Sequence, residues 1–354
     1  MFSLFYVLAA CQPALTEIAA EATDSAEPTA PPRFTQVSVG DFQSCGVLVD
    51  GRIGCWGTDP EEIESWVTEH SDDDAGYHGD GHPPAGSSWA TVEMSGMADV
   101  SGGGAGVSHS ACALDVDGLV QCWGRTFPDQ ACGEPGACWP EVPFVQLAVG
   151  WMDACGRDDA GAVYCWGHEF GAGELVATGA QEITVLNWNL NVLHEDGTHS
   201  RYVFIEGWGW TDQSVPYSDD DVELGELRLV ERSYNCVFSS ARNAVLCDPF
   251  DDPEAESLSD GLRSTVHWNP PFEPEWVSGY YESFCALDAA GAAVCDYHVG
   301  SDGEPSPGEL PGEFAQLSMR TGQASSGCGV LRDGSVHCWG RVASPTSETL
   351  RLAE

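Results

Sequence analysis

One stretch of the sequence, residues 58–90, gathers the side chains with the greatest capacity for metal chemistry. Imidazoles and carboxylates are interspersed there, and such groups can ligate a transition metal or Ca²⁺. Their spacing matches no established metal site, so we favour a solvated acidic loop and keep a metal-assisted hydrolase as an alternative. No other cofactor is expected. The candidate ligands are His70, Asp72, Asp73, Asp74, His78, Asp80 and His82.

The segment HEDGTH, from His194 to His199, superficially resembles the zinc-binding helix of metalloproteases. That motif needs two histidines about four residues apart, whereas these two are five apart. Asp196 and Gly197 instead favour a β-hairpin turn. The chain also contains no G-x-S-x-G motif and no lysine, which removes lysine-dependent catalysis. We therefore expect a protein that is not an enzyme.

The cysteines form the strongest pattern in the sequence. Apart from Cys11, the 15 cysteines fall into seven local pairs. Structural zinc sites favour cysteines separated by about two to four residues, and no such spacing occurs here. Local pairing of an even number of cysteines indicates disulfides, which persist in exported proteins. The predicted bridges are Cys45–Cys55, Cys112–Cys122, Cys132–Cys138, Cys155–Cys165, Cys236–Cys247, Cys285–Cys295 and Cys328–Cys338.

Five of these pairs share a glycine six residues after the first cysteine, and this glycine predicts how the two strands align. In the first unit, residues 49–51 form a three-residue loop that ends in a left-handed glycine. Leu48 then lies opposite Arg52, and counting outward places Cys45 opposite Cys55 at a non-hydrogen-bonded position. Cα atoms are close at such positions, which suits a disulfide. The spacing, the turn and the bridge therefore predict one register.

A strand-like phrase precedes each hairpin, so the hairpins belong to a longer repeat. One copy lacks cysteine: Gly197 is its turn glycine, and Asn191 and Arg201 occupy the cysteine positions. An atypical hairpin near Asn243 completes a set of seven. Repeats of roughly 40 residues with several short strands are typical of propellers. We predict an all-β, seven-bladed β-propeller whose ring is closed by residues 348–353. The leading phrases occupy 34–40, 97–103, 144–150, 225–231, 274–280 and 314–320.

Four hairpins end in Cys-Trp-Gly, at Trp56, Trp123, Trp166 and Trp339. The recurrence of these tryptophans predicts that they pack between blades. In the units VSVGDFQSCGVLVDGRIGCWG and ACALDVDGLVQCWG, the repeat resembles that of the regulator of chromosome condensation family. The resemblance covers residues 34–354 and is good in the first three units and the last, and weak in the others.

This resemblance implies a propeller, and the closer relatives are exported bacterial proteins with cysteine-stapled repeats. The founding members of the family bind chromatin as exchange factors, and some propellers of this kind bind enzymes as inhibitors. A shared fold does not by itself carry a function over. The charge of this chain and its expected compartment both argue against chromatin binding.

The beginning of the chain predicts export. It opens with almost wholly apolar residues that are too few to span a bilayer and that match the core of a signal peptide. They end in Leu-Ala-Ala-Cys, which resembles a bacterial lipobox in which Cys11 would carry lipid. We predict a signal peptide with lipobox at 1–11, a flexible tether at 12–33 and the propeller domain at 34–354.

The charge balance limits the possible partners. The chain has 56 acidic and 13 basic residues, giving a formal net charge of −43. Nucleic-acid binding needs cations that displace condensed counterions, so we expect no nucleic-acid partner. Anionic lipid surfaces would also repel the chain, so we expect membrane contact only through the lipid at Cys11. We expect the folded part to be a monomer.

These observations favour an exported interaction module. We expect an outer-membrane or cell-surface lipoprotein, or otherwise a secreted or periplasmic protein. The stereotyped hairpins contrast with irregular insertions at 58–96, 125–143 and 206–224, which would bind an unidentified protein, peptide or glycan. The alternatives are the metal-assisted hydrolase using the 58–90 insertion and a passive acidic component of the cell envelope.

Overall fold

A computed structural model gives the fold of the chain. The chain divides into two units, Met1–Ala30 and Pro31–Glu354, and all described residues belong to the second unit. The described ranges are 31–40, 43–57, 85–94, 98–99, 106–107, 110–124, 139–150, 153–167, 171–186, 189–205, 209–212, 225–230, 236–247, 265–280, 283–297, 308–319, 326–340, 344–346 and 349–352.

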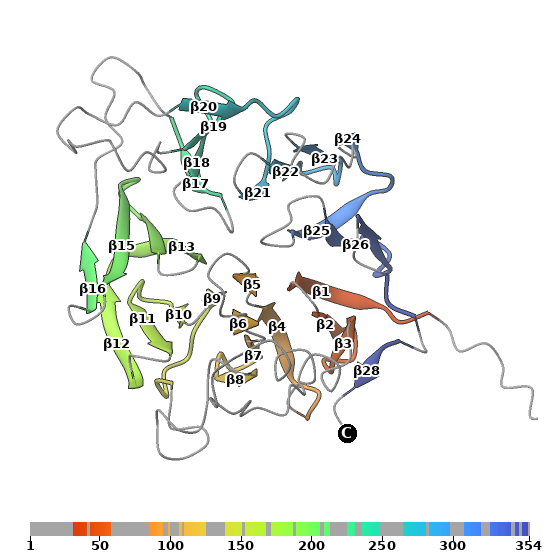
Figure 1. Ribbon diagram of the computed structural model, residues 1–354, viewed down its shortest axis with the longest axis horizontal. Helices are drawn as coiled ribbons and strands as arrows, with labels where there is room; N and C mark the ends of the chain where they lie inside the picture. The colour runs from red at the N-terminus through yellow and green to blue at the C-terminus, as the bar shows by residue number, and fades with distance from the viewer. Residues whose placement is uncertain are drawn as a thin grey trace, which may run out of the picture. The chain divides into compact units, whose positions relative to one another are not determined.

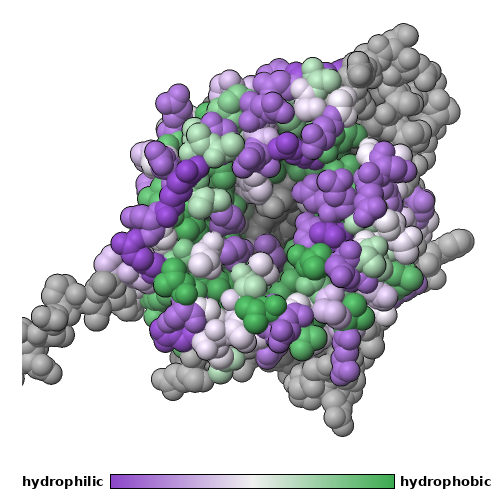
Figure 2. All heavy atoms as spheres, turned by 180° about the vertical axis from the view of Figure 1, so that it is seen from behind, coloured by the Kyte–Doolittle hydropathy of each residue, from purple (hydrophilic) through white to green (hydrophobic). Residues whose placement is uncertain are grey.

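Seven antiparallel sheets follow one another around a ring, and each sheet is one blade of a β-propeller (Figure 1). The predicted all-β, seven-bladed fold is therefore confirmed. Seen from the other side, the surface is hollowed near its centre (Figure 2). Within the described ranges, we find no helix long and apolar enough to cross a membrane.

We number the blades along the chain. Blade 1 consists of β1 (Phe34–Val39), β2 (Gln43–Leu48), β3 (Ile53–Gly57) and β28 (Arg351–Leu352). Blade 2 consists of β4 (Trp89–Met94), β7 (Ser110–Asp115) and β8 (Val120–Gly124). Blade 3 consists of β9 (Gln146–Val149), β10 (Asp153–Arg157), β11 (Val163–Gly167) and β12 (Gly171–Ala177). A separate two-stranded ribbon consists of β5 (Ala98–Asp99) and β6 (Gly106–Val107).

The remaining four blades complete the ring. Blade 4 consists of β13 (Ala180–Leu186), β14 (Asn189–His194), β15 (His199–Ile205) and β16 (Gly209–Asp212). Blade 5 consists of β17 (Leu227–Leu229), β18 (Cys236–Ser239), β19 (Ala244–Cys247) and β20 (Thr265–Trp268).

Blade 6 consists of β21 (Trp276–Tyr280), β22 (Ser283–Leu287), β23 (Ala293–Tyr297) and β24 (Gly308–Glu309). Blade 7 consists of β25 (Phe314–Met319), β26 (Gly327–Leu331) and β27 (Val336–Trp339).

The strand register is the one that the cysteine spacing predicts. In blade 1, Cys45 pairs with Cys55, and the Leu48 N–H donates to the Arg52 carbonyl at 2.8 Å. Six of the seven predicted pairs form disulfides, with Cα atoms 3.9–4.1 Å apart. The pair Cys132–Cys138 and the lipidation candidate Cys11 lie outside the described residues.

The prediction that residues 97–103 form the leading strand of blade 2 is wrong. The strand that pairs with β7 is β4, and Trp89, Val92 and Met94 take the places that Phe34, Val37 and Val39 take in blade 1. The phrase at 97–103 contributes only β5, which pairs with β6. The strand from Trp89 to Met94 has apolar residues at the three positions that face the interface between blades, which explains why it becomes the leading strand.

Three other boundaries change with the register. The two predicted ranges for the insertion in the first repeat, 58–90 and 58–96, both run into β4, so this insertion ends before that strand. The insertion drawn as 206–224 contains β16, the fourth strand of blade 4. The C-terminal phrase closes the ring as predicted, but as the outer strand of blade 1 beside β3 rather than in a leading-strand position.

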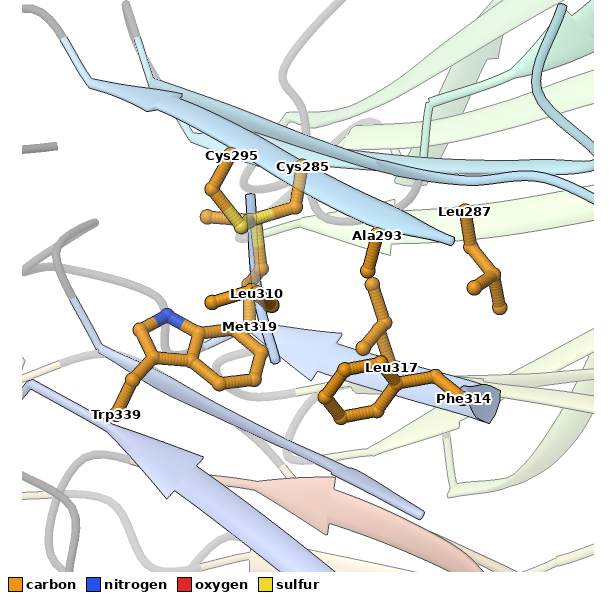
Figure 3. Packing of buried hydrophobic residues seen from close by; sticks show 9 residues of the cluster. All are labelled: Cys285, Leu287, Ala293, Cys295, Leu310, Phe314, Leu317, Met319 and Trp339. Atoms are coloured by element: carbon orange, nitrogen blue, oxygen red, sulfur yellow. A yellow bond between two sulfur atoms is a disulfide. The ribbon is translucent and has the colours of Figure 1, made fainter. Parts of the chain in front are cut away.

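The core consists of clusters between neighbouring blades, and the disulfide of one blade packs against a large side chain of the next. Trp123 of blade 2 lies in the cluster that holds the disulfide of blade 1, and Trp166 of blade 3 lies with that of blade 2. Figure 3 shows the same arrangement between blades 6 and 7, where Trp339 and Met319 point toward Cys285 and Cys295. The predicted role of the tryptophans between blades is confirmed, and each is at most 8% exposed.

A backbone hydrogen bond also joins neighbouring blades at the hairpin turns. At five junctions a residue at or just before the start of a leading strand donates its N–H to the carbonyl of the preceding blade's turn glycine. We call this contact the turn latch. In the latch between blades 2 and 3, Phe144 donates to Gly118 at 2.8 Å, and a Cβ on Gly118 would lie 2.5 Å from the Phe144 carbonyl oxygen. Glycine is therefore required for the close approach as well as for its φ of +82°.

Candidate binding face

The hairpin turns that join the second and third strands of the blades share one side of the propeller, which we call the turn face. In blade 1, the Gly51 N–H donates to the Leu48 carbonyl at 2.8 Å, and Gly51 has a φ of +81°. Blade 5 reaches the left-handed region with Asn243, at a φ of +46°. This confirms the atypical hairpin near Asn243, because asparagine tolerates that region better than other non-glycine residues.

Aspartates stiffen these turns by accepting hydrogen bonds from the backbone that follows them. Asp196 Oδ1 accepts the Thr198 N–H at 2.9 Å, and Asp333 Oδ1 accepts the Ser335 N–H at 2.9 Å. Side-chain hydrogen bonds from Thr198 and Ser335 hold the pKa of these carboxyls below the usual value, and Arg52 does the same for Asp50. These carboxylates therefore stay ionised at neutral pH and place negative charge on the turn face.

Outside the atypical turn of blade 5, the first residue of the turn loop has the same backbone position in every blade, but its side chain varies. It is valine in blades 1 and 2, an acid in blades 3 and 4, alanine in blade 6 and arginine in blade 7. Val49 is 65% exposed and Val116 is 70% exposed, so large apolar side chains face solvent at the same turn position of two neighbouring blades. The turn face therefore presents apolar, acidic and basic side chains at different blades on one repeated backbone.

The two valines belong to a larger exposed group on blades 1 to 3. Leu119, which follows the turn of blade 2, and Val145, at the entry to blade 3, are also about half exposed. We call Val49, Val116, Leu119 and Val145 the apolar patch. The turn latches hold its blades in sequence, because Trp89 donates to the Gly51 carbonyl at 3.0 Å and Phe144 donates to that of Gly118.

A different feature lies on the turn of blade 4, where an open depression of about 300 Å³ has a polar lining. Its Gly197 differs from the other turn glycines, because a Cβ built there would meet nothing within 4 Å. The lining combines two carboxylates, an imidazole and two hydroxyl groups. It consists of Thr178, Gly179, His194, Glu195, Asp196 and Thr198.

The HEDGTH segment is a hairpin, as predicted, and not a metal-binding helix. His194 ends β14 and His199 begins β15. The Nε2 atom of His194 lies 2.8 Å from Ser200 Oγ. Burial, together with the nearby His194 and Arg201, lowers the pKa of His199 to about 4, so it is neutral at neutral pH. Among the described residues, no three His, Cys, Asp or Glu side chains are grouped to hold a metal.

Blade 4 replaces the disulfide with a polar pair. Asn191 lies opposite Arg201, as the repeat alignment predicts, in the register that cysteines occupy elsewhere. Arg201 donates from Nε and Nη2 to the Asn189 side-chain oxygen at 3.1 and 2.7 Å. This hairpin is therefore held by side-chain hydrogen bonds where its neighbours have a covalent bridge.

The predicted metal ligands His70, Asp72, Asp74, His78 and His82 all lie outside the described residues. The metal site stays a prediction, and metal analysis of the purified protein tests it. The apolar patch, by contrast, was missed by sequence reasoning. Its signal was present as valine directly before Asp-Gly in two turns, a place where turns usually carry polar residues.

Comparison with known proteins identifies the fold but no family. No protein-family model and no curated protein matches the chain. Among solved structures, the ectodomain of the Physcomitrella patens receptor kinase CR4 is 16% identical with a TM-score of 0.52, covering 90% of this chain and 77% of that one. Prp20p from Saccharomyces cerevisiae, the yeast RCC1, is 12% identical with a TM-score of 0.48, covering 89% and 83%. At such identities, the likeness to the CR4 ectodomain shows that this chain shares the propeller fold.

Proposed function

We propose that this protein is an exported interaction module that binds a protein, peptide or glycan through the turn face of its propeller. It acts by binding and not by catalysis. The observation that carries the proposal is the contrast between the repeated backbone of the turns and the different side chains at their first loop position. A rigid scaffold with varied outward residues is how many binding surfaces are built.

Two further features support export and rigidity. Disulfides persist in oxidising compartments, and the described part of the propeller has six. A scaffold held by disulfides and turn latches loses little conformational entropy when a partner binds. In this proposal the protein sits at the cell envelope, anchored by a lipid on Cys11, with the tether at 12–33 holding the propeller away from the membrane.

The test is affinity capture from the native cell envelope with the cysteines kept oxidised. We compare the wild type with a variant that carries Val49→Ser, Val116→Ser and Glu195→Ser. These changes alter three first loop residues without touching a turn glycine. We expect the variant to recover about tenfold less of each specific partner, because each buried apolar contact contributes roughly 1–2 kcal/mol.

Leu175→Ser is the matched control for this experiment. Leu175 is a 51% exposed apolar residue on β12, in the outer strand of blade 3 and away from the turns. Its substitution should leave partner recovery unchanged. Equal recovery by the wild type and the turn-face variant would contradict the proposal.

A further inference from the structure

We infer that the apolar patch binds a segment of a partner protein in which aliphatic side chains stand next to arginine or lysine. This inference rests on the proposed function and adds the chemistry of the partner. Four of the six large apolar side chains that are exposed in the described residues belong to the patch. They gather on the turns of blades 1 and 2 and at the adjacent entry to blade 3.

The continuity of the patch follows from the backbone contacts between its blades. Val116 donates its N–H to the Ser88 carbonyl at 2.8 Å, and the next residue, Trp89, donates to Gly51 in the turn that contains Val49. On the other side, the Gly118 carbonyl accepts from Phe144, the residue before Val145. The backbone segments that carry the four side chains are therefore hydrogen-bonded one to the next from blade 1 to blade 3. This arrangement suits an extended partner segment.

Carboxylates border the patch and determine the charge of the partner. Asp115 Oδ1 accepts the N–H groups of Asp117 and Leu119 at 2.9 Å, which fixes this carboxylate within the turn of blade 2. In blade 1, Arg52 neutralises Asp50 at 2.8 Å, so the negative charge beside the patch comes from the turn of blade 2. Within the described residues no ion pair involves Asp115 or Asp117, and a partner that covers the patch meets this charge, which arginine or lysine side chains complement.

Other occupants fit this surface less well. Anionic lipid would be repelled by the carboxylates and by the net charge of −43. Glycans are usually held by aromatic rings and converging polar groups, whereas the patch is aliphatic. The chain's own segment 12–30 has four carboxylates and no basic residue, so it does not complement the patch.

The experiment places a photo-reactive amino acid at Val116 in the full-length, oxidised protein and cross-links it in the cells that produce it. The same residue at Leu175 is the control, because that position is exposed and apolar but lies off the patch. Mass spectrometry identifies the cross-linked segment. We expect a protein segment with aliphatic residues and at least two arginines or lysines, found at Val116 and absent at Leu175.

Two further measurements test the physical basis. Val145→Ser should lower the cross-linking yield at Val116 about tenfold, since a buried valine contributes roughly 1.5 kcal/mol. Lysing the cells before irradiation and raising the salt to about 1 M should also lower the yield severalfold, because charge complementarity is screened. A disulfide map by non-reducing mass analysis confirms that each variant is folded.

The outcomes separate the inference from the proposed function. A cross-linked segment without basic residues, a lipid or glycan adduct, or no adduct beyond the Leu175 control would each overturn the inference. If the serine variant of the turn face nevertheless loses its partner, the proposed function stands without the inference. If that variant also keeps every partner, both fail.

Discussion

Two junctions of the ring, between blades 7 and 1 and between blades 4 and 5, are held by different sets of contacts. At the first junction, Phe34 donates to the Gly334 carbonyl at 2.7 Å, which is a turn latch. The Gln316 side chain accepts the Val37 N–H at 3.1 Å and donates to the Val37 carbonyl at 2.9 Å. Ser318 Oγ accepts a further N–H of β1 at 3.0 Å. Four hydrogen bonds, which involve Phe34, Gln316 and Ser318, therefore join these blades.

The junction between blades 4 and 5 has fewer such contacts in the described residues. Glu182 takes the place of the glutamine and accepts the Leu229 N–H at 3.3 Å. No described backbone donor reaches Gly197, so the turn latch is missing from this part of the structure. Asn191 and Arg201 stand where the other blades have a disulfide.

The two junctions differ in their side chains and not in chain connectivity. Blade 7 is followed along the chain by β28, which belongs to blade 1, so the chain links the blades at both junctions. Blades 1 and 2 are also consecutive, yet Trp89 latches onto Gly51 and Gln36 bonds to Val92 there. The smaller set of contacts between blades 4 and 5 therefore follows from Glu182 in place of glutamine and from the missing latch.

The largest effect should come from removing the disulfide that faces the closing junction. Cys328 is fully buried and lies in the cluster of Phe34 and Trp56. Replacing Cys328 and Cys338 by alanine should lower the free energy of unfolding by about 4 kcal/mol, from chain entropy and a small cavity. Denaturant unfolding followed by tryptophan fluorescence measures this, and a loss below about 1 kcal/mol would contradict it.

Alanine at two turn glycines should separate latched from unlatched turns. Gly118→Ala brings Cβ against the Phe144 carbonyl and should lower stability by about 3 kcal/mol. Gly197→Ala meets no neighbouring atom and should lower it by only about 1 kcal/mol, for the left-handed backbone alone. Thermal unfolding of the two variants compares them. Equal losses would show that the latch contributes nothing.

A disulfide can be added where blade 4 lacks one. Asn191→Cys with Arg201→Cys places two cysteines in the register of the native bridges. It should raise the free energy of unfolding by about 2 kcal/mol, despite the loss of the bonds to Asn189. Non-reducing mass analysis verifies the bridge, and the single variants serve as controls. A bridged variant that is no more stable would indicate that blade 4 does not limit the fold.

Acid should weaken blade 4 before the others. The pKa of His199 is about 4 in the folded state and about 6.5 when unfolded, so only the unfolded state binds a proton between these values. Stability is full above pH 6.5 and should fall by about 3 kcal/mol as the pH drops toward 4. Hydrogen exchange of β14 and β15 across this range measures it. His199→Gln should remove this step, and a step that persists would refute the assignment.

The smallest effect should come from the side-chain contacts between leading strands. Gln316→Ala removes the bonds to Val37 and should lower stability by about 1 kcal/mol. Glu182→Ala removes one longer bond and should cost about half as much. Unfolding in guanidinium chloride at matched temperature compares the two. A larger loss for Glu182→Ala would reverse the ranking of the junctions.

Most of the fold could be predicted from the sequence, because the spacing of cysteines and turn glycines indicates which residues pair across each hairpin. The spacing of Cys45, Gly51 and Cys55 specified strand pairing, and Gly197 revealed a blade without a disulfide. The leading strand of blade 2 was misplaced, because the phrase at 97–103 lies nearer the hairpin and ends in glycine as those of blades 1 and 3 do, whereas Trp89–Met94 does not. Local patterns predict hairpins well, whereas the choice between two candidate strands depends on packing across blades.

The candidate binding face was harder to predict than the fold. The sequence places Val49 in a turn loop, but the exposure of Val49 and Val116 depends on what the neighbouring blades cover. The turn latches are backbone contacts between segments far apart in the sequence, so no residue type in the sequence indicates them. The sequence therefore predicted which cysteines form disulfides, whereas only the assembled ring shows which side chains remain exposed to solvent.

The pairing of β28 with β3 also governs how the protein can be made. A chain is made and exported from its N-terminus, so β3 emerges while the roughly 300 residues that separate it from β28 are still to come. During that time the outer edge of β3 has no partner and can pair with strands of other unfinished chains. Keeping the early blades apart until the last strand arrives thus becomes a task for the cell's chaperones, and crowded synthesis should produce tangled oligomers before it produces unfolded monomers.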